Sequence, residues 1–92
     1  MGKLSEAEVA SKMGSAPDWK RNGDEISRTF QFKDFAGAMR FVNAVADAAE
    51  KANHHPDIDI RWNKVKLALS THDAGGLTEK DFALAKTADQ LA

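Results

Sequence analysis

The three histidines of this chain are its residues best suited to chemistry, and all of them lie between residues 54 and 72. His54 and His55 are adjacent, and His72 follows in the segment Ser70-Thr71-His72-Asp73. An imidazole gives or takes a proton near neutral pH, because its unperturbed pKa is about 6.5. Histidines grouped in this way predict general acid–base chemistry that they share.

Pro56 sets the two adjacent histidines apart. A proline fixes its own φ and biases the residue before it toward an extended backbone. Side chains of adjacent extended residues point in opposite directions, so one of His54 and His55 can act on a ligand while the other anchors it or faces away. The alternative for such a pair is a solvent-exposed cap at the end of a helix.

Three further residues near the histidines each have two interpretations. Glu50 lies one helical turn before His54, where it either hydrogen-bonds a histidine or is simply solvated on a polar helix face. Asp81 follows Thr78 by three residues, which predicts a capping box that could hold the His72 loop, with a direct role as the alternative. Trp62 is expected on the core side of a strand, with an aromatic wall for a flat ligand as the alternative.

Metal, nucleophilic and nucleotide sites are weaker predictions. Histidines with nearby carboxylates suggest a metal site, but adjacent histidines in extended backbone do not easily chelate one ion, so we expect none. Ser70 and Thr71 are neighbours of His72 in sequence, which does not establish a nucleophile. Gly75-Gly76 lacks the spacing of a phosphate-binding loop.

The composition is that of an ordinary globular protein. Ninety-two residues predict one domain over 1–92, and a net charge of −1 predicts no attraction to nucleic acid or to an acidic membrane. No cysteine is present, which excludes disulfides and thiolate chemistry. We find neither a membrane-spanning run nor a signal peptide, so the expected location is the cytoplasm.

Apolar periodicity predicts three helices and four strands. Ser5 with Glu8 marks a short first helix, Asp34 begins a long helix over 34–52, and Thr78 begins the last helix. Asn22-Gly23 predicts a first hairpin, and Asn63-Lys64 predicts a turn between two later strands. The order αββαββα indicates an α+β fold, a four-stranded antiparallel sheet with helices packed on one face.

The second hairpin brings the histidines together. A turn at Asn63-Lys64 places residue 57 roughly opposite residue 70. The start of the third strand, beside His54 and His55, then lies near the end of the fourth strand, beside His72. A shift of the turn by one residue would change this register.

The whole pattern resembles the pterin-4a-carbinolamine dehydratases. The spacing Glu50-x3-His54-His55-Pro56-x5-Trp62-x9-His72-x8-Asp81 is similar to their signature, and segments such as Trp62-Asn63-Lys64-Val65 agree. The resemblance runs from about Trp19 to Leu91. It implies the αββαββα fold, and loss of water from a 4a-hydroxytetrahydropterin to give quinonoid dihydropterin without cofactor or metal.

The resemblance also implies roles for the site residues. His54 and His72 resemble the acid–base pair, in either assignment, and His55 resembles a catalytic-site residue that binds and orients the substrate. Glu50, Trp62 and Asp81 would support the site. It further implies a pterin as the small-molecule partner and a homodimer or homotetramer. A non-catalytic protein-binding module of the same fold is the alternative. The expected substrate-contacting residues are Asn53, His54, His55, Pro56, Ser70, Thr71, His72 and Asp73.

Overall fold

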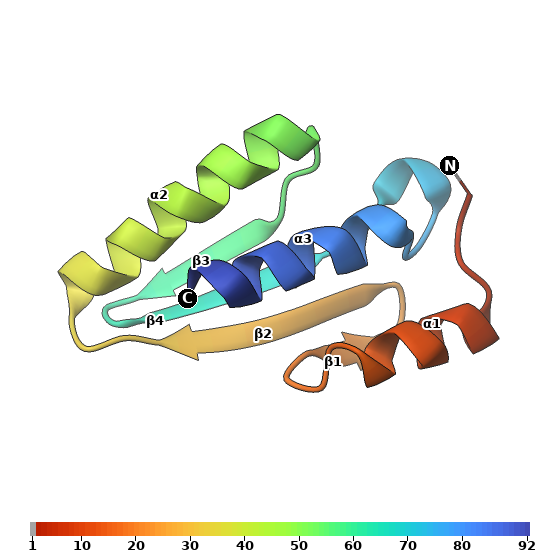
Figure 1. Cartoon of the computed structure of the whole chain (residues 1–92), viewed down its shortest axis with the longest axis horizontal. Coiled ribbons are helices and arrows are strands. Elements are labelled where there is room, and N and C mark those ends of the chain that lie inside the picture. Colours follow the sequence, from red (N-terminus) through yellow and green to blue (C-terminus); the bar gives the residue numbers. More distant parts are fainter. Residues whose placement is uncertain (1) are drawn as a thin grey trace.

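Three helices and a four-stranded antiparallel sheet make up the computed structural model, which describes residues 2–92 (Figure 1). The strands lie in the spatial order β1-β2-β4-β3. This arrangement confirms the α+β class and the order αββαββα. The elements are α1 (Glu6–Gly14), β1 (Lys20–Asn22), β2 (Glu25–Gln31), α2 (Phe35–Ala52), β3 (Asp57–Arg61), β4 (Lys64–Leu69), the short 3-10 helix η1 (His72–Ala74) and α3 (Glu79–Leu91).

The helices begin at the predicted caps. The backbone N–H of Glu8 donates to Ser5 Oγ over 3.2 Å, and the Glu8 carboxylate accepts from the Ser5 backbone N–H over 2.8 Å. That backbone hydrogen bond holds the pKa of the exposed Glu8 carboxyl below its usual value. Asp34 caps α2 by accepting from the Gly37 backbone N–H over 2.8 Å. Local sequence therefore sets where each helix starts.

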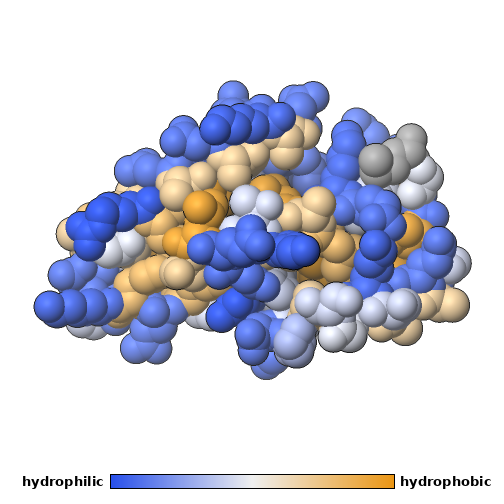
Figure 2. Space-filling view, in the orientation of Figure 1, coloured by the Kyte–Doolittle hydropathy of each residue, from blue (hydrophilic) through white to orange (hydrophobic). Residues whose placement is uncertain are grey.

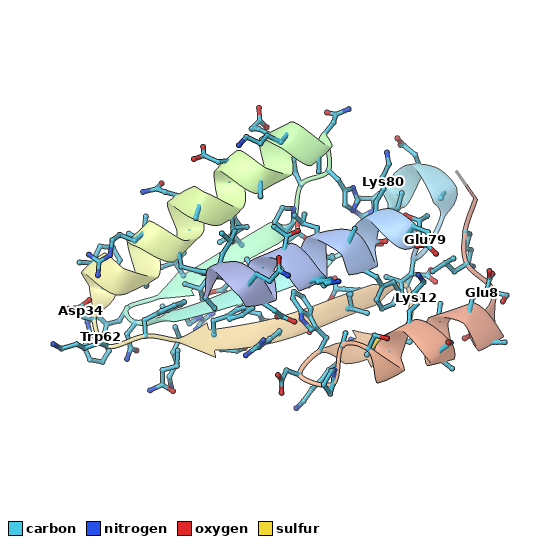
Figure 3. The ribbon with its side chains drawn as sticks, viewed as in Figure 1. Glu8, Lys12, Asp34, Trp62, Glu79 and Lys80 are labelled. Atoms are coloured by element: carbon cyan, nitrogen blue, oxygen red, sulfur yellow. The ribbon has the colours of Figure 1, made fainter. Side chains whose placement is uncertain are left out.

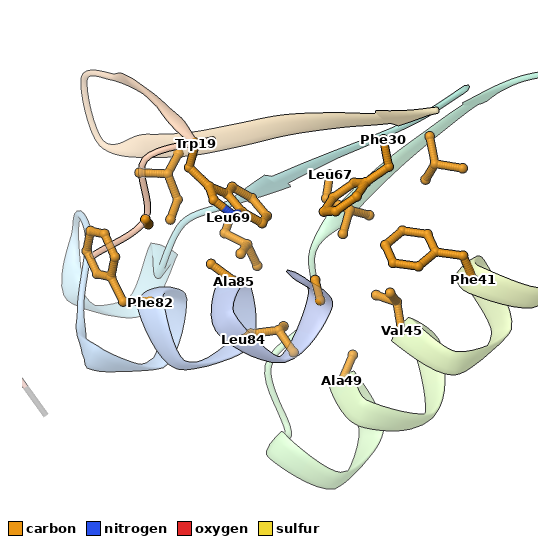
Figure 4. Close-up of a cluster of buried hydrophobic side chains, with 14 of the residues drawn as sticks. Trp19, Phe30, Phe41, Val45, Ala49, Leu67, Leu69, Phe82, Leu84 and Ala85 are labelled. Atoms are coloured by element: carbon orange, nitrogen blue, oxygen red, sulfur yellow. The ribbon is translucent and has the colours of Figure 1, made fainter. Parts of the chain in front are cut away.

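The core lies between one face of the sheet and the helices (Figure 4). Alternate residues of β2 and β4 point toward α2 and α3, and Val9 of α1 joins the same buried cluster. On the helix side, apolar side chains lie in the furrows between the helices and hydrophilic ones on the ridges (Figure 2). Within residues 2–92, no helix is long and apolar enough to cross a membrane. The largest buried apolar side chains include Trp19, Ile26, Phe30, Phe41, Val45, Val65, Leu67, Leu69 and Leu84.

The apolar stripe of α2 differs in part from the prediction. Phe41 is buried although the periodic pattern left it out, and its ring packs at a tilt against that of Phe30, with centroids 4.6 Å apart. Phe35, expected in the stripe, is 51% exposed because it lies at the first turn of the helix, at the end of the sheet. Ala46, also expected there, is exposed.

Both hairpin turns lie one residue away from their predicted places. Asn22 pairs with Glu25, so the first turn is Gly23-Asp24, and Gly23 supplies the positive φ of 63°. In the second hairpin Arg61 pairs with Lys64, so the turn is Trp62-Asn63.

Asn63 explains the position of the second turn. It is buried, its carbonyl accepts from the Phe32 backbone N–H over 2.8 Å, and its side-chain Nδ2 donates to the Phe32 carbonyl over 2.8 Å. Asp57 consequently lies opposite Ala68 and not opposite residue 70. The register differs from the prediction by two residues, so every side chain keeps its expected face of the sheet.

Trp62 contradicts its predicted place in the core. It lies in the turn with a φ of 52°, and 68% of the residue is exposed. The alternation of Ile58, Ile60 and Trp62 continues past the last paired residue of β3, where the strand conformation ends. The alternation of apolar residues correctly predicted the strand, but it wrongly predicted that Trp62 would be buried.

Asp89 of α3 connects the last helix to the first hairpin. Its Oδ1 accepts from Trp19 Nε1 over 2.9 Å and from Arg28 Nη1 over 2.6 Å. The Arg28 guanidinium also stacks over the Phe30 ring at 4.2 Å from its centroid. The Asp89 carboxylate therefore accepts hydrogen bonds both from a buried indole and from a half-buried guanidinium.

We expect Asp89→Ala to lower the free energy of unfolding by about 1–3 kcal/mol, because it leaves the Trp19 N–H and the Arg28 cation without this acceptor. Urea unfolding followed by tryptophan fluorescence measures the change. Asp47→Ala on the exposed face of α2 is the control and should stay within about 0.5 kcal/mol of the wild type. Equal stability of the two variants would contradict a structural role for Asp89.

Candidate active site

The end of α2 places the adjacent histidines. Asn53 ends the helix in the left-handed conformation with a φ of 51°, and its N–H bonds the Glu50 carbonyl over 3.2 Å. The His54 N–H bonds the Ala49 carbonyl over 3.1 Å. Asparagine tolerates this conformation better than most residues. The chain therefore turns sharply before Pro56 and presents both histidines between α2 and β3.

The side chains of the two adjacent histidines contact different carboxylates. The His54 Nε2 lies 2.6 Å from Asp81 Oδ1, and the His55 Nε2 contacts Glu50 Oε2. The His54 side chain is 11% exposed, whereas that of His55 is 57% exposed. The two side chains therefore reach different partners, as expected for adjacent side chains that point apart, and the imidazole of His54 is largely buried whereas that of His55 is exposed. The contact of Glu50 with His55 agrees with one of the two interpretations of Glu50 that the sequence left open.

Asp81 has no exposed surface and uses both carboxylate oxygens. Besides His54 at Oδ1, its Oδ2 accepts from Thr71 Oγ1 over 2.8 Å and from the Thr78 backbone N–H over 2.9 Å. The predicted capping box with Thr78 is present. The contact with His54 was not predicted. It makes Asp81 a direct positioning residue for His54, and through Thr71 Asp81 also holds the segment that carries His72.

The Asp81 contact selects the form of the neutral His54 ring. A carboxylate oxygen accepts, so the proton of a neutral imidazole lies on Nε2 and its Nδ1 is the basic nitrogen. No buried side-chain nitrogen or oxygen in the described chain lacks a partner, so Nδ1, which makes no hydrogen bond there, is reached by solvent. In this ring form Nδ1 is the nitrogen of His54 with a free lone pair.

One hollow of about 310 Å³ collects the predicted site residues. It lies between the end of α2, the end of β4 and the start of α3, where Lys80 is seen in Figure 3. Its volume is at the lower end of the range for small-molecule sites. The residues lining it are Asn53, His54, His55, Ser70, Thr71, His72, Asp73 and Lys80.

Three residues differ from the predicted set. Lys80 was not predicted, although it follows the Thr78 cap and directly precedes Asp81, which would have been the signal for it. Pro56 is not among the lining residues and acts through the backbone of His55. Trp62 lies in the turn of the hairpin, at the opposite end from Lys80 (Figure 3), so within one chain it does not support the site as predicted.

Two other observations favour the histidine-lined hollow as a site for proton transfer over another hollow or a metal site. A larger hollow of about 510 Å³ is lined by Arg28, Lys66 and four other residues, none of which is a histidine. In residues 2–92, no three His, Asp or Glu side chains converge as a metal-binding group would. The arrangement of the histidine-lined hollow suits proton transfer between two imidazoles and a ligand.

We expect Asp81→Asn to change the tautomer of His54. The amide nitrogen donates where the carboxylate only accepted, which favours the ring form with its proton on Nδ1. Nitrogen NMR of the labelled imidazoles measures the tautomer. Thr71→Val is the control, because it removes a hydrogen bond to Asp81 and leaves the His54 contact in place. An unchanged His54 tautomer in Asp81→Asn would contradict the positioning role.

Sequence comparison identifies the relatives of this chain. The family model described as pterin 4 alpha carbinolamine dehydratase matches residues 2–91. A protein of Chloroflexus aurantiacus, named as a candidate pterin-4-alpha-carbinolamine dehydratase, is 58% identical over 91 residues, covering 99% of this chain and 98% of its own length. One of Thermomicrobium roseum with the same name is 53% identical over 92 residues, covering 100% of this chain and 99% of its own length.

Solved structures share the fold. A Brucella melitensis protein described as a transcriptional coactivator/pterin dehydratase matches with a TM-score of 0.95 and 33% identity, covering 99% of each chain. A pterin dehydratase-like protein described as a RuBisCO assembly factor in the alpha-carboxysome matches with a TM-score of 0.67 and 25% identity, covering 80% of this chain and 86% of its own. With the histidine-lined hollow and these full-length matches, this chain belongs to the pterin 4 alpha carbinolamine dehydratase family, a family of hydro-lyases.

Proposed function

We propose that this protein removes water from a 4a-hydroxytetrahydropterin to give quinonoid dihydropterin. The observation that carries the proposal is that His54 and His72, from segments far apart in sequence, line one hollow. The relatives and the family model carry the name of this reaction. The resemblance implies no cofactor, and we propose the cytoplasm as the place of the reaction.

The reaction is a balanced elimination. The C4a–O bond breaks, and the departing hydroxide takes a proton from a general acid to leave as water. The N5–H bond breaks, its electron pair becomes the C4a–N5 double bond, and a general base takes that proton. Hydroxide is a poor leaving group, so protonation at the oxygen lowers the barrier. Two imidazoles beside the C4a–N5 bond supply the acid and the base.

We assign these two roles to His54 and His72, with His55 as the anchor. His54 is half-buried and oriented by Asp81, whereas His72 is exposed at the start of η1 on the other side of the hollow. His55 is exposed and held by Glu50, so it can contact a ligand at the rim. Polar groups of Asn53, Ser70, Thr71 and Asp73 offer hydrogen bonds to the pyrimidine edge of a pterin.

We expect His54→Ala and His72→Ala each to lower kcat by roughly 10²-fold or more, the usual contribution of a general acid or base. His55→Ala should mainly raise KM, because an anchor contributes to binding in the ground state and in the transition state alike. Quinonoid dihydropterin formation from the 4a-carbinolamine measures both constants. Wild-type kcat in both His54→Ala and His72→Ala would contradict the assignment.

A non-catalytic binding role is the second candidate, and two solved relatives favour it. Their descriptions name a transcriptional coactivator and an assembly factor. Dehydratase turnover by the purified wild type supports the enzyme, whereas capture of one defined partner by a protein without turnover supports the binding module. Both readouts come from the same preparation, so the two candidates are separated directly.

We also propose that copies of this chain associate through β3. This strand is at the edge of the sheet, so the backbone groups on its outer side are unpaired within one chain. Ile58 and Ile60 are each 38% exposed and Trp62 is 68% exposed on or beside it. An apolar edge strand favours pairing with a second strand, and an identical copy gives a closed, symmetric pair.

We expect Ile60→Lys to shift the protein toward the monomer, because a lysine on an edge strand disfavours strand addition. Light scattering after size-exclusion chromatography over a range of concentrations measures the mass. Thr29→Lys on the exposed face of β2, which β4 separates from β3, is the control and should keep the wild-type mass. A monomeric wild type at every concentration would contradict association through β3.

A further inference from the structure

The segment before α1 lies against the loop that carries His72. The backbone N–H of Leu4 donates to the Leu77 carbonyl over 2.8 Å, and the Leu4 side chain packs against the buried core. Figure 1 shows the chain passing beside η1 before it reaches α1. We call Lys3 and Leu4 the N-terminal strap, and residues 71–78 the His72 loop. The two come from opposite ends of the sequence and meet at one backbone hydrogen bond.

Gly76 allows the strap to approach the loop closely. Gly76 is buried, and a Cβ on it would lie 2.8 Å from Lys3 Cε and 3.2 Å from Asp24 Oδ1, so any side chain here would displace Lys3. Lys3 Nζ also lies 4.0 Å from Asp24 Oδ1, but more than half of each side chain is exposed, and such an ion pair contributes little. The hydrogen bond from Leu4 is therefore the main fixed contact between the strap and the loop.

α1 holds the strap in place from its other side. Val9 of this helix is buried, and Lys12 Nζ donates to Glu79 Oε2 over 2.8 Å. Figure 3 shows Lys12 and Glu79 side by side at the start of α3. Glu79 directly follows the His72 loop in sequence. The strap is therefore anchored by α1 on one side and bonded to Leu77 on the other.

Support from outside matters because the His72 loop has weak hydrogen bonds of its own. Asp81 holds its two ends, through Thr71 Oγ1 and the Thr78 N–H. Between them, Thr71 and Gly76 exchange backbone hydrogen bonds over 3.2 and 3.3 Å, at or beyond the usual limit for N–H···O. His72 itself is exposed and begins the single turn of η1. Its position depends on whether this bridge between Thr71 and Gly76 stays closed.

We propose that Leu4 is a positioning residue for His72. Its backbone N–H holds the Leu77 carbonyl and so keeps the bridge between Thr71 and Gly76 closed. The closed bridge keeps His72 at the wall of the histidine-lined hollow. Without the bond from Leu4 the loop opens more often, while the sheet and the helices stay folded. The effect on the loop stands by itself, whereas the effect on turnover rests on the proposed dehydratase function.

Leu4→Pro and Leu4→Ala form a matched pair, because both remove the leucine side chain and only proline also lacks the backbone N–H. Amide hydrogen exchange measured residue by residue reports how often the loop opens. The amides of Thr71 and Gly76 should exchange roughly fivefold faster in Leu4→Pro than in Leu4→Ala, the effect of losing one hydrogen bond on a local opening equilibrium. The Leu67 amide in the centre of the sheet should exchange equally in both variants.

Turnover of the 4a-carbinolamine by the same proteins tests the role in the reaction. Leu4→Pro should lower kcat more than it raises KM relative to Leu4→Ala, because a displaced His72 loses proton transfer. Equal exchange at Thr71 and Gly76 in the two variants, or faster exchange at Leu67 as well, would overturn the strap. Faster loop exchange with equal kcat would overturn the positioning of His72. A wild type without turnover contradicts the proposed function, and the exchange rates then still decide the strap.

Discussion

The buried carboxylate of Asp81 is the interaction on which the rest of the site depends. A carboxylate without solvent contact is unfavourable unless its oxygens accept hydrogen bonds, and here three donors from three segments supply them. His54 comes from the end of α2, Thr71 from the end of β4, and Thr78 from the start of α3. The same carboxylate thus caps a helix, fixes an imidazole and holds the segment of His72. Folding of these segments and assembly of the site are one process.

The sequence predicts this arrangement as far as local rules reach. Capping boxes involve residues three apart, so the Ser5–Glu8 and Thr78–Asp81 boxes were predicted and are present. The His54–Asp81 contact joins residues 27 apart, and a capping interpretation of Asp81 left its other oxygen unassigned. The second turn likewise moved because Asn63 bonds Phe32, which lies 31 residues earlier. Tertiary hydrogen bonds decide details that neighbouring residues do not specify.

Alternation along a strand predicts which face a side chain is on, but not what covers that face. Ile58 and Ile60 point to the helix side, opposite the fully buried Leu67 and Val65. They are nevertheless half-exposed, because β3 is the edge strand and no further strand lies beside it. Sequence alone does not show that β4, the later strand, lies between β2 and β3. The exposed apolar edge is a consequence of strand order and not of composition.

The three histidines differ in how much the fold depends on them. His55 and His72 are exposed and take no part in the core, so a relative can replace them with little loss of stability. His54 differs, because its loss leaves an oxygen of buried Asp81 without that donor. The fold therefore constrains His54, and it does not constrain His55 or His72 in the same way. A variant that keeps a partner for Asp81 but lacks His55 and His72 should therefore retain the sheet and helices, because neither of these two side chains contributes to the buried core.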